Sequence, residues 1–183
     1  MREPYKGPVR IADASYEGEI MRLAELIHKE NGFFNMDRGM VRSMLYRAFD
    51  RQGGIMGVIG TPNNVESMIY MLLSNFWYTA DPHWEELWNY VAPEYRHTTH
   101  CVEQIRFAKW CSIESKIPLL IGVISNKRTE GKARLYRRVL GDPVGSFFMW
   151  KPDGASMNDE GFLTVVSRST NRHGNGAQVP GRT

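Results

Sequence analysis

Apolar residues recur every three or four positions in four stretches of the chain, which is the spacing of an amphipathic helix. The expected helices span residues 16–31, 37–50, 98–115 and 129–139. The core-facing stripe of the first consists of Ile20, Leu23, Ala24 and Ile27. Gly32 follows this helix and Gly53 follows the second, and glycine commonly ends a helix.

Runs of apolar, β-branched and aromatic residues alternate with these helices and are typical of strands. The expected strands span residues 9–12, 55–60, 65–78, 83–91, 117–123 and 145–150. The run 65–78 also has the composition of a buried helix, but its flanking turns favour a strand. The order of elements predicts an α/β or α+β protein with a mixed sheet. Its first half is expected to be antiparallel, and helix 98–115 is expected to form a right-handed crossover.

The length of 183 residues suits one domain, which we expect to span residues 1–152. Residues 153–183 are rich in Gly, Ser and Asn and predict a partly flexible tail. The apolar patch 162–166 within it predicts one docked strand or a contact with a partner.

Localisation follows from what the sequence does not show. No signal peptide is visible, and no apolar run approaches the roughly 20 residues of a membrane span. Cys101 and Cys111 are ten residues apart, roughly 15 Å on one helix, which is too far for a disulfide. These features predict a cytoplasmic protein that does not enter the membrane.

The net charge of +3 is unevenly distributed. Residues 96–138 carry ten Lys or Arg against three Asp or Glu, whereas residues 1–95 carry nine against thirteen. The basic segment is consistent with a site for a phosphorylated cofactor, with a nucleic-acid patch or with a solvated helix face.

The turn Val91-Ala92-Pro93-Glu94-Tyr95-Arg96 joins strand 83–91 to helix 98–115. A helix start that follows a strand directs unpaired N–H groups and the positive end of the helix dipole at one place. Such a place binds a pyrophosphate. The segment therefore predicts an enzyme that uses a phosphate-bearing carrier.

Residues 8–150 resemble the GNAT superfamily of acyl-CoA-dependent N-acyltransferases in the order of elements and in three motifs. The turn is similar to the family's V-x-P-E-Y-R entry to the CoA-binding helix, and 117–123 resembles the strand that follows. Ala133-Arg134-Leu135-Tyr136 resembles the family's A-x-x-L-Y helix. Thr99 and Cys101 stand where the family usually has glycine or alanine. Asn126 lies ten residues before Tyr136 rather than seven, and Thr129 takes the usual place.

The resemblance implies a GNAT-like sheet, mostly antiparallel, and direct transfer of an acetyl group from acetyl-CoA to a primary amine in a ternary complex. It implies that Tyr136 protonates the leaving thiolate and that Glu86 is the general base through a water, with Glu85 and His83 as alternatives. Glu86 is preferred because it is expected to share a strand face with two aromatic residues, whose apolar surface would raise its pKa. The expected CoA-binding residues are Tyr90, Val91, Arg96, His97, Thr98, Thr99, His100, Cys101, Asn126 and Lys132.

Other interpretations stay open. A zinc site at His97, His100 and Cys101 lacks a fourth ligand, so no metal is expected. A GNAT-fold protein without activity that binds a host protein is one alternative, and a nucleic-acid-directed modifier is another. Similar loops occur in virus-encoded relatives, which suggests a phage origin, and members of the family often form homodimers. The acceptor is either a small molecule or a protein, and the acidic first half of the chain favours a cationic amine.

Overall fold

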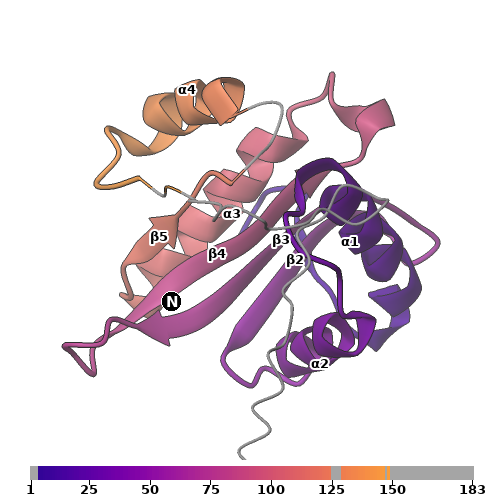
Figure 1. Ribbon diagram of the computed structural model, residues 1–183, viewed down its shortest axis with the longest axis horizontal. Coiled ribbons are helices and arrows are strands. Elements are labelled where there is room, and N and C mark those ends of the chain that lie inside the picture. Colours follow the sequence, from indigo (N-terminus) through magenta and orange to yellow (C-terminus); the bar gives the residue numbers. More distant parts are fainter. Residues whose placement is uncertain (1–3, 125–128, 147, 149–183) are drawn as a thin grey trace, which may run out of the picture.

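The computed structural model describes residues 4–124, 129–146 and 148 (Figure 1). Its helices are α1 (Glu17–Asn31), α2 (Arg38–Phe49), α3 (His100–Ser115) and α4 (Thr129–Leu140), with short 3-10 turns η1 (Ala14–Tyr16) and η2 (Pro93–Tyr95). Its strands are β1 (Arg10–Ile11), β2 (Gly54–Thr61), β3 (Asn64–Asn75), β4 (Pro82–Val91) and β5 (Leu119–Ile121). The four helices and five of the six strands expected from the sequence are confirmed. The tail 153–183 and most of the sixth strand, 145–150, lie outside the described residues.

The five strands form one sheet in the order β1-β2-β3-β4-β5. β1 to β4 pair antiparallel with their neighbours in sequence, and β5 pairs parallel with β4. The long α3 lies between β4 and β5 in the chain, as a parallel connection requires. The expected mixed sheet, antiparallel in its first half, is confirmed.

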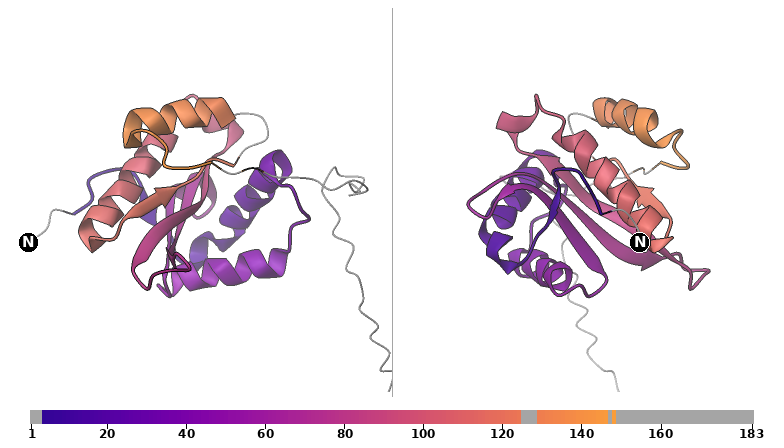
Figure 2. Two further views of the ribbon diagram at one scale, coloured as in Figure 1. Left: turned by 60° about the vertical axis from the view of Figure 1, so that its left-hand side comes forward. Right: turned by 180° about the vertical axis from the view of Figure 1, so that it is seen from behind.

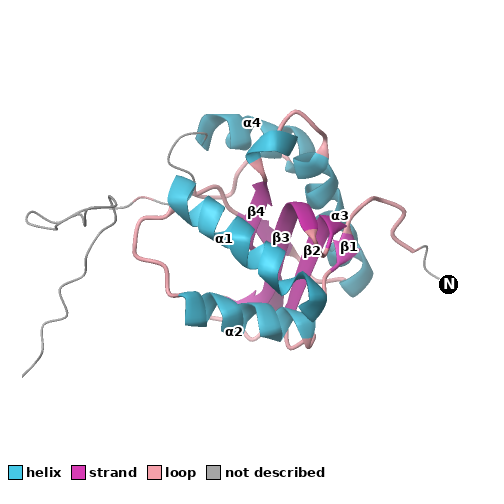
Figure 3. Ribbon diagram, turned by 90° about the vertical axis from the view of Figure 1, so that its right-hand side faces the viewer, coloured by secondary structure: helices cyan, strands magenta, loops and turns pink. Residues whose placement is uncertain are grey.

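Helices cover both faces of the sheet (Figures 2 and 3). On one face α1 and α2 bury residues such as Leu23 and Leu45 against Met68 and Tyr70 of β3. The opposite face packs against α3, where Phe107 joins the cluster that holds the intervening strand residues Ile69 and Met71. Alternate residues of β3 thus enter two separate cores, because successive side chains of a strand point to opposite faces.

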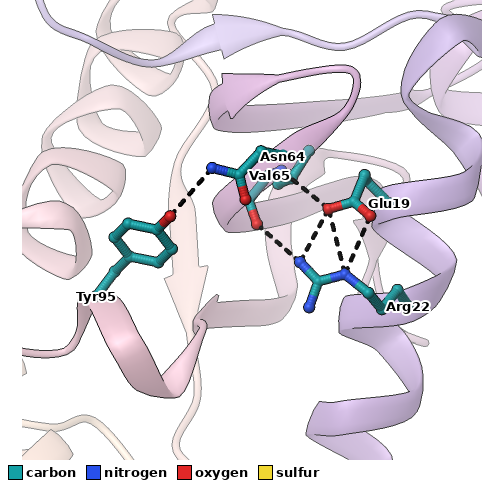
Figure 4. A network of polar contacts seen from close by, with 5 residues as sticks. All are labelled: Glu19, Arg22, Asn64, Val65 and Tyr95. Carbon is teal, nitrogen blue, oxygen red and sulfur yellow. Dashed lines mark hydrogen bonds and ion pairs between the residues drawn. The ribbon is translucent and has the colours of Figure 1, made fainter.

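Polar contacts fix the turn that leads into α3 from the side of α1 (Figure 4). The Glu19 carboxylate accepts hydrogen bonds from the Val65 backbone N–H at 3.1 Å and from the Arg22 guanidinium at 2.9 Å. The neighbouring Asn64 Nδ2 donates to the Tyr95 hydroxyl at 3.0 Å. Through these hydrogen bonds the β2–β3 turn links α1 to η2.

A side chain of β3 holds His100, the first residue of α3, in place. His100 Nε2 lies 2.6 Å from a Glu66 carboxylate oxygen of β3, and its ring stacks on Tyr95.

Among the described residues, no helix combines the length and the apolar character that crossing a membrane requires.

Candidate active site

A cavity of about 1050 Å³ lies where β4, the start of α3 and α4 meet. α4 lies beside α3 (Figures 1 and 2), and Lys109 of α3 donates to the Val139 carbonyl oxygen of α4. The lining residues come from five segments: Glu30, Asn31, Asn89, Tyr90, Val91, Arg96, Thr98, Cys101, Thr129, Glu130, Gly131, Lys132, Arg134 and Leu135.

One edge of β4 lines this cavity with little strand pairing. β5 pairs only with residues 84–86 of β4, although β4 continues to Val91. Within the described part of the chain, residues 87–91 have no strand on that side. Of the backbone N–H and C=O groups in this stretch, those that are not bonded to β3 point to this edge and are available to an extended ligand, except that the Val91 carbonyl oxygen accepts a bond from Arg96 Nε at 3.1 Å.

A β-bulge at Leu87 changes which face of the sheet Glu86 occupies. Trp88 pairs with Tyr70, and Glu86 pairs with the next residue, Met71, so that Leu87 is the extra residue. Leu87 and Trp88 both pack against the α1–α2 core as a result. The expectation that Glu86 shares a face with Trp88 and Tyr90 is therefore wrong, because a bulge shifts the alternation by one residue.

Glu86 instead lies among groups from α3 and α4. Burial raises the pKa of its carboxyl group to about 8, and nearby Lys132 and a hydrogen bond from the Gly122 backbone N–H oppose this rise. The expected elevation of its pKa is present, although Trp88 and Tyr90 are not its cause. A carboxyl group with such a pKa can accept a proton near neutral pH.

Tyr136 of α4 is buried close to Glu86. Burial raises the pKa of its phenol well above the ordinary value, and the carboxyl group of Glu86 and the thiol of Cys101 add to this rise. Asn89 Nδ2 donates to the Tyr136 hydroxyl oxygen at 3.3 Å and opposes the rise. Tyr136 thus stays protonated at neutral pH and can serve as a proton donor.

The start of α3 is only partly capped by side chains. The capping residue Thr99 makes no cap hydrogen bond with its side chain, and the His100 N–H donates to the Thr98 hydroxyl at 3.3 Å, so the next N–H groups, those of Cys101 and Val102, remain for another acceptor. The Thr98 hydroxyl is used locally, since it donates to the Tyr95 carbonyl oxygen at 2.6 Å. Cys101 lies in the first turn, and burial raises the pKa of its thiol.

Arg96 lies in the cavity wall but is engaged by the protein. Its Nη2 group donates to both carboxylate oxygens of Glu30 at 2.8 and 2.7 Å, and its guanidinium lies over the Tyr90 ring. The Tyr90 hydroxyl donates to Glu30 as well, at 2.9 Å. Arg96 therefore links the end of α1 to the turn before α3.

Of the residues expected to bind the carrier, the structure brings six to the cavity wall: Tyr90, Val91, Arg96, Thr98, Cys101 and Lys132. His97 and Thr99 are exposed, and His100 is bonded to Glu66; none of the three lines the cavity. Asn126 lies outside the described residues. In the described part of the chain, no three His, Cys, Asp or Glu side chains form a group able to hold a metal ion.

Sequence reasoning missed Asn89 and Glu30. Asn89 is an amide between the aromatic residues Trp88 and Tyr90 at the end of β4, and this contrast is a signal that points to it. Glu30 gave no signal, because its partner Arg96 lies 66 residues away in the chain.

No protein-family model matches the chain, and no curated protein matches it in sequence. Solved structures do match its fold. AAC(6')-Iy in complex with the bisubstrate analogue CoA-S-monomethyl-acetylneamine has a TM-score of 0.62 at 6% identity, over 79% of this chain and 96% of that one. A ribosomal-protein-alanine N-acetyltransferase from Brucella melitensis biovar Abortus 2308 has a TM-score of 0.58 at 10% identity, over 78% and 98% of the two chains.

An aminoglycoside antibiotic 6'-N-acetyltransferase from Acinetobacter haemolyticus has a TM-score of 0.57 at 10% identity, over 79% of this chain and 99% of that one. The chain therefore has the GNAT fold of these acetyltransferases, as its sequence predicted. At such low identity the likeness concerns the fold.

Proposed function

We propose that this protein is an acetyl-CoA-dependent N-acetyltransferase that transfers an acetyl group directly to a primary amine. One observation carries the proposal. The open edge of β4 and the first turn of α3 meet in a single cavity, and its lining residues Lys132 and Asn89 interact with the Glu86 carboxyl group and the Tyr136 phenol, both with raised pKa values.

The cavity wall fits the carrier. The first N–H groups of α3 would bind the pyrophosphate together with the helix dipole, and the Lys132 ammonium adds a positive charge. The backbone of residues 87–91 would bind the amide groups of the pantetheine arm in the manner of an added strand. Acetyl-CoA, when bound, supplies an acetyl group activated as a thioester.

Two residues would move the protons. Glu86 would remove a proton from the attacking ammonium group, through a water, once its own carboxyl group is ionised. Tyr136 would donate its hydroxyl proton to the sulfur that leaves. Both roles need the cavity to hold amine and thioester together, which is the requirement of a ternary complex.

The acceptor would be an amine on a small molecule or on a protein. The neighbours named above include enzymes for aminoglycosides and for a ribosomal protein. The two carboxylates in the wall of the cavity, those of Glu30 and Glu130, are paired with Arg96 and Arg134, so they give the cavity no net negative charge.

The carrier site is tested by filling it. Cys101→Trp places an indole in the cavity at the start of α3, whereas Ile113→Trp places the same group at an exposed position of the same helix. We expect Cys101→Trp to weaken acetyl-CoA binding about tenfold or more, which corresponds to about 1.4 kcal/mol, and Ile113→Trp to leave it unchanged. Isothermal titration calorimetry measures both, and thermal melting shows whether each variant is folded.

Amine acceptors would then be screened by release of the CoA thiol. The proposal fails if the wild-type protein binds neither acetyl-CoA nor CoA. Binding that survives in Cys101→Trp would place the carrier outside this cavity.

A further inference from the structure

Asn89 is buried at the wall of the cavity, with 4% of its surface exposed. Its Nδ2 group donates to the Tyr136 hydroxyl oxygen and also interacts with the Cys101 thiol. Its Oδ1 atom is buried and has no hydrogen-bond partner among the described residues. One end of this amide is thus used by the protein, and the other end is left for something else.

We infer that Asn89 is a positioning residue that directs the hydroxyl proton of Tyr136 into the cavity. The inference rests on the proposed acetyl transfer, in which that proton goes to the departing sulfur. An amide nitrogen only donates, so the phenol oxygen must act as the acceptor toward Asn89. The single hydrogen of the phenol then has to point elsewhere.

The unpartnered Oδ1 atom supports a role toward a ligand. Buried polar atoms are nearly always satisfied in a folded protein, and an amide with only a structural role would bond at both ends. An N–H group of a bound ligand would complete Asn89. The same contact would hold the amide in the orientation in which it donates to Tyr136.

The proton and the electrons balance without a further reactant. When the bond between the acetyl carbon and sulfur breaks, its electron pair stays on sulfur, which takes the Tyr136 proton. The amine nitrogen bonds to the acetyl carbon; the first proton that it loses stays on Glu86, and the second, which it loses as the amide forms, returns to the Tyr136 oxygen. Among the described residues, the titratable groups that interact with Tyr136 are Glu86 of β4 and Cys101 of α3, and Lys132 of α4 interacts with both of them.

CoA itself tests the inference without a known acceptor. A thiolate accepts a hydrogen bond better than a thiol does, so the wild-type protein should bind CoA more tightly relative to desulfo-CoA as the pH rises from about 6 to about 9. We expect this preference to grow about tenfold. Calorimetry with the two ligands at each pH gives the ratio of their dissociation constants.

Asn89→Asp keeps the shape of the side chain but places an ionised acceptor against the phenol, which then donates to Asp rather than to sulfur. The rise with pH in the preference for CoA over desulfo-CoA should therefore be absent in this variant. The matched control is Asn64→Asp, because Asn64 Nδ2 also donates to a tyrosine hydroxyl but lies outside the cavity wall (Figure 4). This control should keep the wild-type rise.

A double variant separates proton direction from simple repulsion by the new charge. In the Tyr136→Phe background, Asn89→Asp should change the CoA preference no further. A further loss there would show repulsion and would overturn the inference, as would an Asn89→Asp single variant with the wild-type rise. The latter result would mean that the amide has the opposite orientation and accepts from Tyr136.

Asn89→Leu provides a second variant if Asp at this site prevents folding. It removes both the donor and the orphaned carbonyl without adding charge, and we expect the rise to shrink because the phenol hydrogen is no longer directed. An unchanged rise would overturn the inference. Failure of the wild-type protein to bind CoA would instead remove the proposed function, and with it this inference.

Discussion

Replacing Glu86 by glutamine removes a carboxyl group that the fold keeps protonated, so the stability of Glu86→Gln relative to wild type should rise with pH. Glutamine resembles the protonated carboxyl group in shape and in charge. At about pH 5 the folded wild-type protein carries a neutral Glu86, and the two proteins should have similar stability. Above that pH the unfolded wild-type protein releases the Glu86 proton more easily than the folded protein does, so only the wild-type protein loses stability through this group.

The size of the effect follows from the shift in pKa. The Glu86 pKa is about 8 in the folded protein, against a usual value of 4.5. Between these values the folded state binds one proton more than the unfolded state, so stability falls as pH rises, by about 1.4 kcal/mol per pH unit. The contribution of Glu86 is fully present below 4.5 and is lost as the pH passes 8. Since the side chain is only partly buried, we expect a difference of about 2 kcal/mol to develop between pH 5 and pH 7.

Urea unfolding of both proteins at pH 5, 6, 7 and 8 measures this difference, because the contributions of all other groups cancel in the comparison. Glu19→Gln is the control. Bonds from Arg22 and the Val65 N–H hold the pKa of Glu19 below its usual 4.5. Its stabilising effect is therefore fully present above 4.5, and the loss caused by Glu19→Gln should be constant from pH 5 to pH 8. A pH-independent difference between Glu86→Gln and wild type would refute the reasoning.

Two further predictions concern Tyr136, which is bonded to Asn89 in the cavity wall, and Arg96, which lines the cavity. Tyr136→Phe should lower turnover by about 10²–10⁴-fold with little change in acetyl-CoA affinity, since it removes a proton donor and keeps the ring. Release of the CoA thiol measures turnover, and calorimetry measures affinity. Unchanged turnover would exclude Tyr136 from the mechanism. Arg96→Met should lower the free energy of unfolding by about 1–3 kcal/mol, because Glu30 loses a two-bond partner, and adding Glu30→Gln should recover part of that loss. Urea unfolding of the two variants tests this, and strictly additive effects would contradict the pairing.

The elements of the fold could be predicted because each carries its own local signal. Ile20, Leu23 and Ala24 form the expected buried stripe of α1. The predicted end of β3 was less accurate, since the strand stops at Asn75 and not at Tyr78. Asn75 Nδ2 donates to the Phe76 and Thr79 carbonyl oxygens, and these bonds turn the chain in spite of the strand-forming aromatic residues that follow.

The candidate site could be predicted only in part, for two physical reasons. The bulge at Leu87 depends on how β4 packs between β3 and the helices, and alternation along β4 alone gives the wrong face for Glu86. The bond between Glu30 and Arg96 joins distant parts of the chain, so no local pattern contains it. Tyr90, Val91 and Cys101 could be predicted to lie together, as they do in the cavity wall, because they belong to one continuous segment.

The short ladder between β4 and β5 has a consequence for how the molecule opens. The antiparallel part of the sheet forms a broad cooperative unit, whereas β5 is joined to it, in the described part of the chain, through three residue pairs. Among the described residues, the contacts of α4 with the rest are few and include the Lys109 bond to Val139 and the buried ring of Tyr136. Elements with so few contacts exchange their amide hydrogens through local unfolding, well before global unfolding occurs. A ligand bound between β4 and α4 would suppress this local unfolding. Its binding could then be measured as slower hydrogen exchange in β5 and α4 alone.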